Sequence, residues 1–275
     1  RGAAAPPAAA GHAGHAGHGG GAPRRHDSSV DVMLASSRDG GRTFGAPTRV
    51  NATAGQVWSF PTARPELAIA PNGTVHVLYT GNDVNAAGKP VIVPMYTRSI
   101  DSGRTFAPSR KLAVVPETDL GHLIHGGFAQ AETFGTIAVD RAGGVHVYWL
   151  DTRFMDDAGD TAALVSVHST DDGRTFGPER VLLKTGMCPC CQLAATLGEG
   201  NALFLGIRYV EDGNRDSHVM RSDDGGLTFG APVRIGGDLR WKIDGCPLKP
   251  TVVAVQGSRV YAAAFNGATE KTGVR

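Results

Sequence analysis

Several features are scarce in this sequence, and each scarcity narrows the class of protein. Among 275 residues there are four cysteines, three tryptophans and five tyrosines. Neither sign of charge dominates, because 27 lysines and arginines face 26 aspartates and glutamates. This balance gives no reason to expect nucleic acid or an anionic membrane as a partner. No apolar run approaches the roughly 18 residues of a membrane-spanning helix, so no membrane span is predicted.

Glycine, in contrast, is abundant. Its 38 copies are about twice the usual share, which indicates many tight turns. An apolar content of 41% is enough for a buried core. No helical periodicity of useful length occurs, so the sequence predicts an all-β fold.

Residues 1–26 form a separate zone of Ala, Gly, Pro and His that has almost nothing to bury. We predict a disordered tail there and a folded region over 27–275. Within the tail, His12, His15 and His18 recur with a period of three. Mobile imidazoles bind copper, nickel or zinc weakly, but an incidental histidine content explains the pattern equally well. The chain begins with Arg1, which fits either a removed signal peptide or a fragment.

A repeated segment determines the predicted fold. Four stretches share the pattern Ser-x-Asp-x-Gly-x-Thr-Phe, and their aspartates are 62, 70 and 53 residues apart. Each is followed by a proline that begins a short strand. The stretches are 37–44, 99–106, 169–176 and 222–229, and their aspartates are Asp39, Asp101, Asp171 and Asp224.

Hairpin patterns alternate with these four stretches. Two β-branched runs are joined by Asn-Gly or Gly-Gly turns over 67–79 and 137–149, and weaker copies start at Leu193 and Val252. Together with a strand before each repeat, they make a unit of four antiparallel strands in roughly 50–70 residues. Such units are typical of the blades of a β-propeller.

The four stretches resemble the Asp box, or BNR repeat, of the sialidase superfamily. The resemblance covers roughly residues 30–267 and implies a six-bladed β-propeller that is secreted or periplasmic. About four blade-equivalents are present, so we expect a chain that is incomplete at its C-terminus. The Cys-Pro-Cys-Cys and Gly-Cys-Pro segments are similar to those of a bacterial sialidase-like subgroup.

The residues of an Asp box indicate that these aspartates stabilise a turn and do not bind a ligand. Glycine supplies the positive φ that the turn needs, and the carboxylate accepts hydrogen bonds from turn N–H groups. We expect the phenylalanine ring to tuck beneath its own turn. Calcium binding by the adjacent acids of two boxes is the less favoured alternative. In the superfamily these turns lie on the face opposite the ligand site.

Ligand-binding candidates therefore lie in the loops at the opposite end of the strands. Sialidases hold a sugar carboxylate with three arginines, since a guanidinium pairs with a carboxylate in a bidentate manner. Arg64, Arg153 and Arg208 fall in suitable loops. Ordinary structural arginines are the competing interpretation. The Tyr–Glu pair of a sialidase cannot be assigned, and Asp83 is only a weak candidate for the catalytic acid.

The cysteines fall in two neighbouring loops of the same kind. One interpretation pairs Cys246 with one of Cys188, Cys190 and Cys191 in a disulfide. The other is a soft metal site for copper or zinc, made by thiolates together with histidines from a neighbouring loop. The histidines are His122 and His125.

These observations favour a secreted sialidase-like propeller that binds a metal, a small molecule or a glycan through its axial face. The alternative is an exo-alpha-sialidase or a related glycoside hydrolase. Whether the chain is an enzyme is left open by its residues, because a fold alone does not fix a function.

Overall fold

The computed structural model describes residues 30–60, 63–88, 90–113, 132–154, 161–237, 240–243, 248–268 and 273–274. Within these ranges the chain is built of strands, with one short 3-10 helix, η1 (Thr152–Phe154), and no α-helix. The all-β prediction is confirmed. None of the described segments is a helix long and apolar enough to cross a membrane. The predicted tail and its histidines lie outside the described residues.

The first half of the chain makes two antiparallel sheets. A two-stranded sheet pairs β1 (Met33–Leu34) with β2 (Thr48–Arg49). A four-stranded sheet follows in the order β3-β4-β5-β6. Its strands are β3 (Glu66–Ile69), β4 (Val75–Val84), β5 (Pro90–Ser99) and β6 (Arg110–Lys111).

Two further four-strand units follow, and a single strand pairing joins them. In the first unit β7 pairs with β8, β8 with β9 and β9 with β10; in the second, β12 pairs with β11 and β13, and β13 with β14. Met187 of β10 is paired with Tyr209 of β12, which links the units into one eight-stranded sheet. The strands are β7 (Glu132–Val139), β8 (Val145–Asp151), β9 (Ala162–Ser169), β10 (Arg180–Met187), β11 (Ala194–Leu197), β12 (Leu203–Glu211), β13 (Asn214–Ser222) and β14 (Val233–Arg234).

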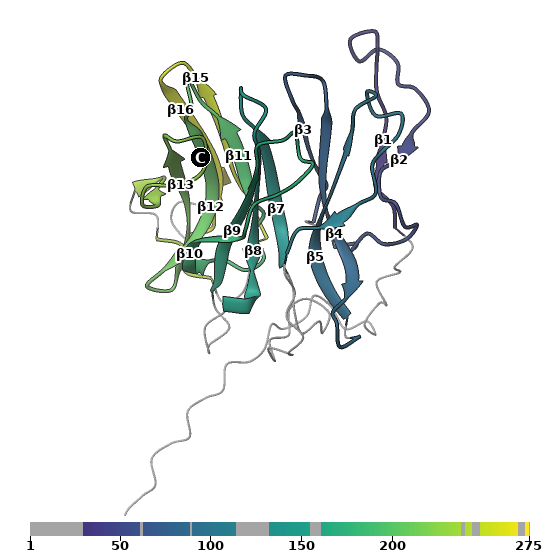
Figure 1. Cartoon of the computed structure of the whole chain (residues 1–275). Helices are drawn as coiled ribbons and strands as arrows, with labels where there is room; N and C mark the ends of the chain where they lie inside the picture. Colours follow the sequence, from purple (N-terminus) through teal and green to yellow (C-terminus); the bar gives the residue numbers. More distant parts are fainter. Residues whose placement is uncertain are drawn as a thin grey trace, which may run out of the picture.

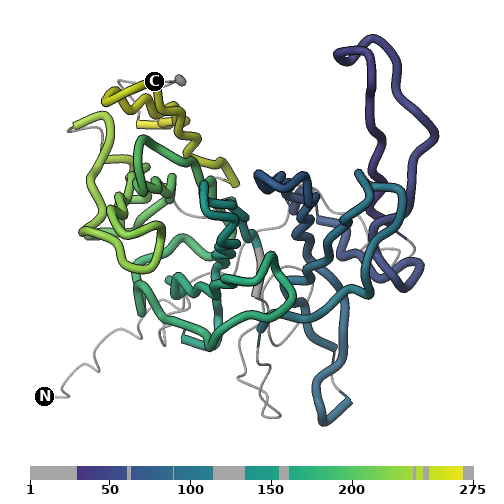
Figure 2. Tube along the Cα trace, turned by 45° about the horizontal axis from the view of Figure 1, so that its top comes forward, coloured from purple at the N-terminus to yellow at the C-terminus, as the bar shows by residue number. Residues whose placement is uncertain are grey.

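A last sheet contains β15 (Thr251–Gln256), β16 (Arg259–Asn266) and β17 (Gly273–Val274). The sheets follow one another across the molecule, with β1 and β2 on one side and β15 and β16 on the other (Figures 1 and 2). No described sheet closes on itself. The four-stranded repeats thus appear, while the number of blades and the closure of a propeller stay predictions.

The hydrophobic core lies between consecutive sheets. Central strands are buried on both faces, as in β8, where all seven residues are buried. One cluster joins the β1–β2 region to β4 and β5, a second joins β4 and β5 to β7, β8 and β9, and a third reaches β11 and β12. In a strand, successive side chains point to opposite faces of the sheet. Because the sheets stack face to face, the apolar residues on both faces of a central strand are buried.

The four repeat turns (37–44, 99–106, 169–176 and 222–229) have one shared geometry. In the first, Asp39 Oδ1 accepts from the backbone N–H of Thr43 at 2.9 Å, and Asp39 Oδ2 accepts from the Thr43 hydroxyl at 2.6 Å. Ser37 donates to Asp39 Oδ1 at 2.6 Å. The same bonds recur in the other turns. These hydrogen bonds hold the pKa of Asp39, Asp101 and Asp171 below the usual range.

The phenylalanine rings of two repeat turns contact the preceding four-strand unit. Phe176 meets Tyr96 with ring centroids 4.9 Å apart, and Phe229 meets Tyr148 at 5.7 Å. That each ring lies beneath its own turn stays a prediction. Phe44 has no described sheet before it and is 65% exposed. The third and fourth repeat turns therefore contact the four-strand unit that precedes them.

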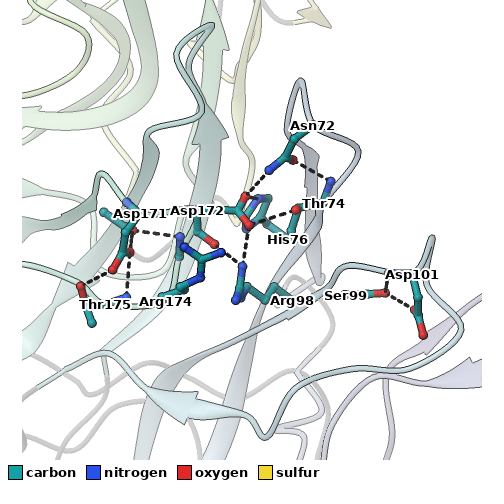
Figure 3. Close-up of polar contacts among 12 residues, drawn as sticks. Asn72, Thr74, His76, Arg98, Ser99, Asp101, Asp171, Asp172, Arg174 and Thr175 are labelled. Carbon is teal, nitrogen blue, oxygen red and sulfur yellow. Dashed lines mark hydrogen bonds and ion pairs between the residues drawn. The ribbon is translucent and has the colours of Figure 1, made fainter.

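Polar contacts reinforce one of these junctions (Figure 3). The carboxylate of Asp172 accepts from Arg98 Nη1 at 2.5 Å, from the Thr74 hydroxyl at 3.0 Å and from Asn72 Nδ2 at 3.1 Å. Its donors come from β5 and the β3–β4 turn of the preceding sheet. Asp172, the acid next to Asp171, thus binds an arginine of the preceding sheet. This contact gives no support to calcium binding by the two adjacent aspartates.

Candidate functional site

The loop after β10 brings the cysteines together. Cys188 follows Met187 directly, and its N–H donates to the Arg208 carbonyl on β12 at 3.0 Å. The Cys191 N–H faces the Cys188 carbonyl at 3.4 Å, which closes a four-residue turn. Pro189 occupies the second position of that turn, where its fixed φ is favourable. A Cys-Pro-Cys-Cys segment therefore folds so that its side chains project from one tight loop.

The three sulfur atoms form one compact cluster, defined here as the cysteine cluster: Cys188, Cys190 and Cys191. All three lie within 4.8 Å of one another, and each side chain is buried. Cys188 Sγ is 3.3 Å from Cys191 Sγ and 3.9 Å from Cys190 Sγ. The predicted proximity of these residues is a property of the structure, while their role as ligands stays a proposal.

Basic side chains border the cysteine cluster. Arg215 Nη1 lies 3.6 Å from Cys188 Sγ. Hydrogen bonding with Cys191, aided by the Arg215 charge, holds the pKa of Cys188 below its usual range. Burial raises the pKa of Cys191, and the neighbouring Cys188 adds to this shift. One thiol of the pair is thus more easily ionised than the other.

The three cysteines differ in bonding state. Neither Cys188 nor Cys191 is disulfide-bonded, so no disulfide joins any two members of the cluster. Cys190 is disulfide-bonded. Cys246, His122 and His125 lie outside the described residues, and their part in a metal site stays a prediction.

The three candidate arginines already have partners. Arg64 Nε donates to Glu66 at 2.6 Å, and Arg153 pairs with Asp151 at 2.5 Å and with Glu179 at 2.8 Å. Arg208 is almost fully buried, and its guanidinium donates to carbonyls of three other segments. The acceptors are Arg215 at 2.6 Å, Phe265 at 3.2 Å and Lys249 at 3.4 Å.

Each of the three arginines thus has partners within the protein, and their part in ligand binding stays a prediction. Asp83, the weak candidate for a catalytic acid, makes an ion pair with Lys111 across β4 and β6 at 2.7 Å. Their predicted ligand roles gain no support from the geometry.

Glu66 is a candidate that sequence reasoning missed. Its carboxylate, at the start of β3, accepts from Arg64 and from Gln192 Nε2, the latter at 3.2 Å, and lies 3.4 Å from the Thr136 hydroxyl of β7. Burial raises the pKa of Glu66. Gln192 adjoins Cys191 in sequence, so this polar group borders the cysteine cluster. The only sequence signal was its place at the start of an inner strand.

Solved structures show a similar fold. The chain matches a protein of unknown function from Dyadobacter fermentans with a TM-score of 0.54 and 15% identity, over 91% of this chain and 68% of that one. It matches the intramolecular trans-sialidase from Ruminococcus gnavus with a TM-score of 0.50 and 12% identity, over 90% and 76%.

The NanB sialidase from Streptococcus pneumoniae matches with a TM-score of 0.50 and 11% identity, over 91% of this chain but only 56% of the sialidase. No protein-family model matches the sequence, and neither does any curated protein. At such identities the likeness concerns the fold alone. The chain thus has a sialidase-like all-β fold.

Proposed function

We propose that this sialidase-like protein binds a thiophilic metal ion, Cu(I) or Zn(II), through its cysteine cluster. The observation that carries the proposal is the convergence of three buried sulfurs within 4.8 Å of one another. Thiolates are soft ligands that favour these ions. No other group of three or more His, Cys, Asp or Glu residues in the described ranges is arranged for a metal.

The spacing of the sulfurs is close to what a metal needs. With a Zn–S bond of about 2.3 Å, sulfurs on a tetrahedral ion are about 3.8 Å apart. The Cys188–Cys190 separation of 3.9 Å meets this value, and the Cys188–Cys191 separation of 3.3 Å has to widen slightly. Arg215 beside the cluster offsets part of the negative charge that bound thiolates bring into the interior.

Titration of the purified protein with Cu(I) and with Zn(II) tests this function. We expect about one ion per chain, with a loss of binding in the double variant Cys188→Ser/Cys191→Ser. Arg221→Gln is a suitable control, because Arg221 is exposed and its guanidinium pairs with exposed Asp223 and lies over the ring of Phe204 instead of contacting a cysteine. Equal metal binding by the double variant and the wild type would contradict the proposal.

We also propose that the protein acts outside the cytoplasm, in the periplasm or as a secreted protein. The disulfide of Cys190 supports this, because disulfides persist in oxidising compartments. Fractionation of the producing cells is the test. A cytoplasmic protein with four reduced cysteines would be the opposite result.

A glycoside hydrolase is the second candidate function, favoured by Glu66. A carboxyl group whose pKa is raised by burial, although Arg64 acts in the opposite direction, is suited to donate a proton to a leaving group. Hydrolysis of a fluorogenic sialoside that is lost in Glu66→Gln would support this function. If the wild-type protein binds metal but does not hydrolyse the sialoside, metal binding is the only one of the two functions that remains.

A further inference from the structure

Cys190 stands apart from the two cysteines beside it. Its sulfur lies in the cysteine cluster, 3.9 Å from Cys188 Sγ, yet it is disulfide-bonded while Cys188 and Cys191 are thiols. A disulfide sulfur is not a thiolate, and the thiolate is the form that ligates metal. With the disulfide intact, the cluster therefore offers two thiolates instead of three.

We infer that the redox state of Cys190 regulates the metal affinity of the cysteine cluster, by switching it between two and three thiolate ligands. This inference rests on the proposed metal-binding function. The step is a reduction by two electrons and two protons, which cleaves the S–S bond and leaves two thiols. A dithiol reductant supplies both, and is itself oxidised to a disulfide.

The geometry requires little movement for the switch. Cys190 Sγ is already at a metal-compatible distance from Cys188 Sγ, since 3.9 Å is close to the about 3.8 Å between two sulfurs on one tetrahedral ion. We expect the turn over 188–191, closed by the Cys191 N–H and the Cys188 carbonyl, to keep Cys190 in place after reduction. Reduction thus adds a ligand in place, without remodelling the loop.

The three side chains are also well shielded. Cys188, Cys190 and Cys191 are 1%, 2% and 2% exposed, and they pack with Met187 and Leu193 in the core. A dry, preformed site magnifies the effect of one additional ligand, because few waters are available to replace a missing thiolate. The number of sulfurs is therefore the variable that sets affinity.

The experiment measures Cu(I) affinity by competition with a chromophoric chelator under anaerobic conditions. The full chain is compared with its disulfide intact and after reduction and removal of the reductant. We expect the reduced protein to bind about tenfold more tightly or better. In Cys190→Ser the affinity should match the disulfide form and stay unchanged by reductant.

X-ray absorption of the wild-type protein counts the ligands independently of whether the variants fold. Three sulfurs per copper after reduction and two before are expected. Tight binding with equal affinity and equal sulfur number in both states would overturn the redox inference but keep the metal-binding function. No competition for Cu(I) in either state would instead remove the metal-binding function itself.

Discussion

At the scale of single residues, glycine shows what each repeat turn contacts. Gly173 has a φ of 73°, and a side chain there would clash with the hydroxyl of Tyr96 on the preceding sheet. Gly41 is the equivalent residue of the first turn, with a φ of 84°, and a methyl group there would meet no other atom within 4 Å. The backbone requirement is therefore the same, and only the neighbouring sheet differs.

This difference predicts unequal effects of alanine. Both substitutions strain a left-handed residue by about 1–2 kcal/mol. Gly173→Ala adds a clash with Tyr96, so its free energy of unfolding should fall by about 1–3 kcal/mol more than that of Gly41→Ala. Denaturant unfolding of the two variants measures this. Equal losses of unfolding free energy in the two variants would show that the contact between Gly173 and Tyr96 does not stabilise the turn.

Buried histidine predicts a pH dependence. Burial, with a contribution from Arg98, lowers the pKa of His76, although Asp172 acts in the opposite direction. The ring also hydrogen-bonds Tyr96. Below its ordinary pKa of about 6.5, the unfolded state binds a proton that the folded state does not bind. The free energy of unfolding should therefore fall as pH drops from about 6.5.

Burial lowers the pKa of His168 and His218 as well, so these residues act in the same direction. Denaturant unfolding at pH 7.5 and pH 5.5 provides the measurement, and the decrease should be smaller in His76→Gln. A stability that rises on acidification over this interval would contradict the assignment of neutral, buried imidazoles.

At the scale of elements, Asp172 predicts how strongly two sheets are joined. Its carboxylate binds Arg98, Thr74 and Asn72 of the preceding sheet (Figure 3). Asp172→Ala removes these bonds and leaves a partly buried guanidinium without its carboxylate, so we expect a loss of about 1–3 kcal/mol. Thermal or denaturant unfolding measures it.

Asp223→Ala is the matched control from the next repeat turn. Asp223 is 72% exposed in its pair with exposed Arg221. Exposed ion pairs contribute about 0–1 kcal/mol, so this variant should unfold nearly like the wild type. A larger loss for the control than for Asp172→Ala would refute the role given to the junction.

The elements were largely predictable from the sequence, since turn glycines and β-branched runs locate hairpins locally. The close approach of Cys188, Cys190 and Cys191 was predictable too, because one short loop carries all three. The contacts of Arg208 and Glu66 were not. Their partners come from residues at sequence separations of up to 126, and only the packing of the sheets brings them together.

At the scale of the whole molecule, successive four-strand units bury their apolar faces against one another. The sialidase-like fold thus carries the cysteine cluster on the loop after β10, next to β12. The fold alone does not determine which chemistry this chain carries out, because one fold hosts many different functions.

Metal content as purified, measured beside a thiol count, tests the central claim most directly. The account predicts about one copper or zinc ion per chain, and thiols that become reactive when a chelator removes the ion. In Cys188→Ser/Cys191→Ser the metal should be absent. A wild-type protein that retains no metal, takes up none after reduction, and exposes the same thiols with and without chelator would contradict it.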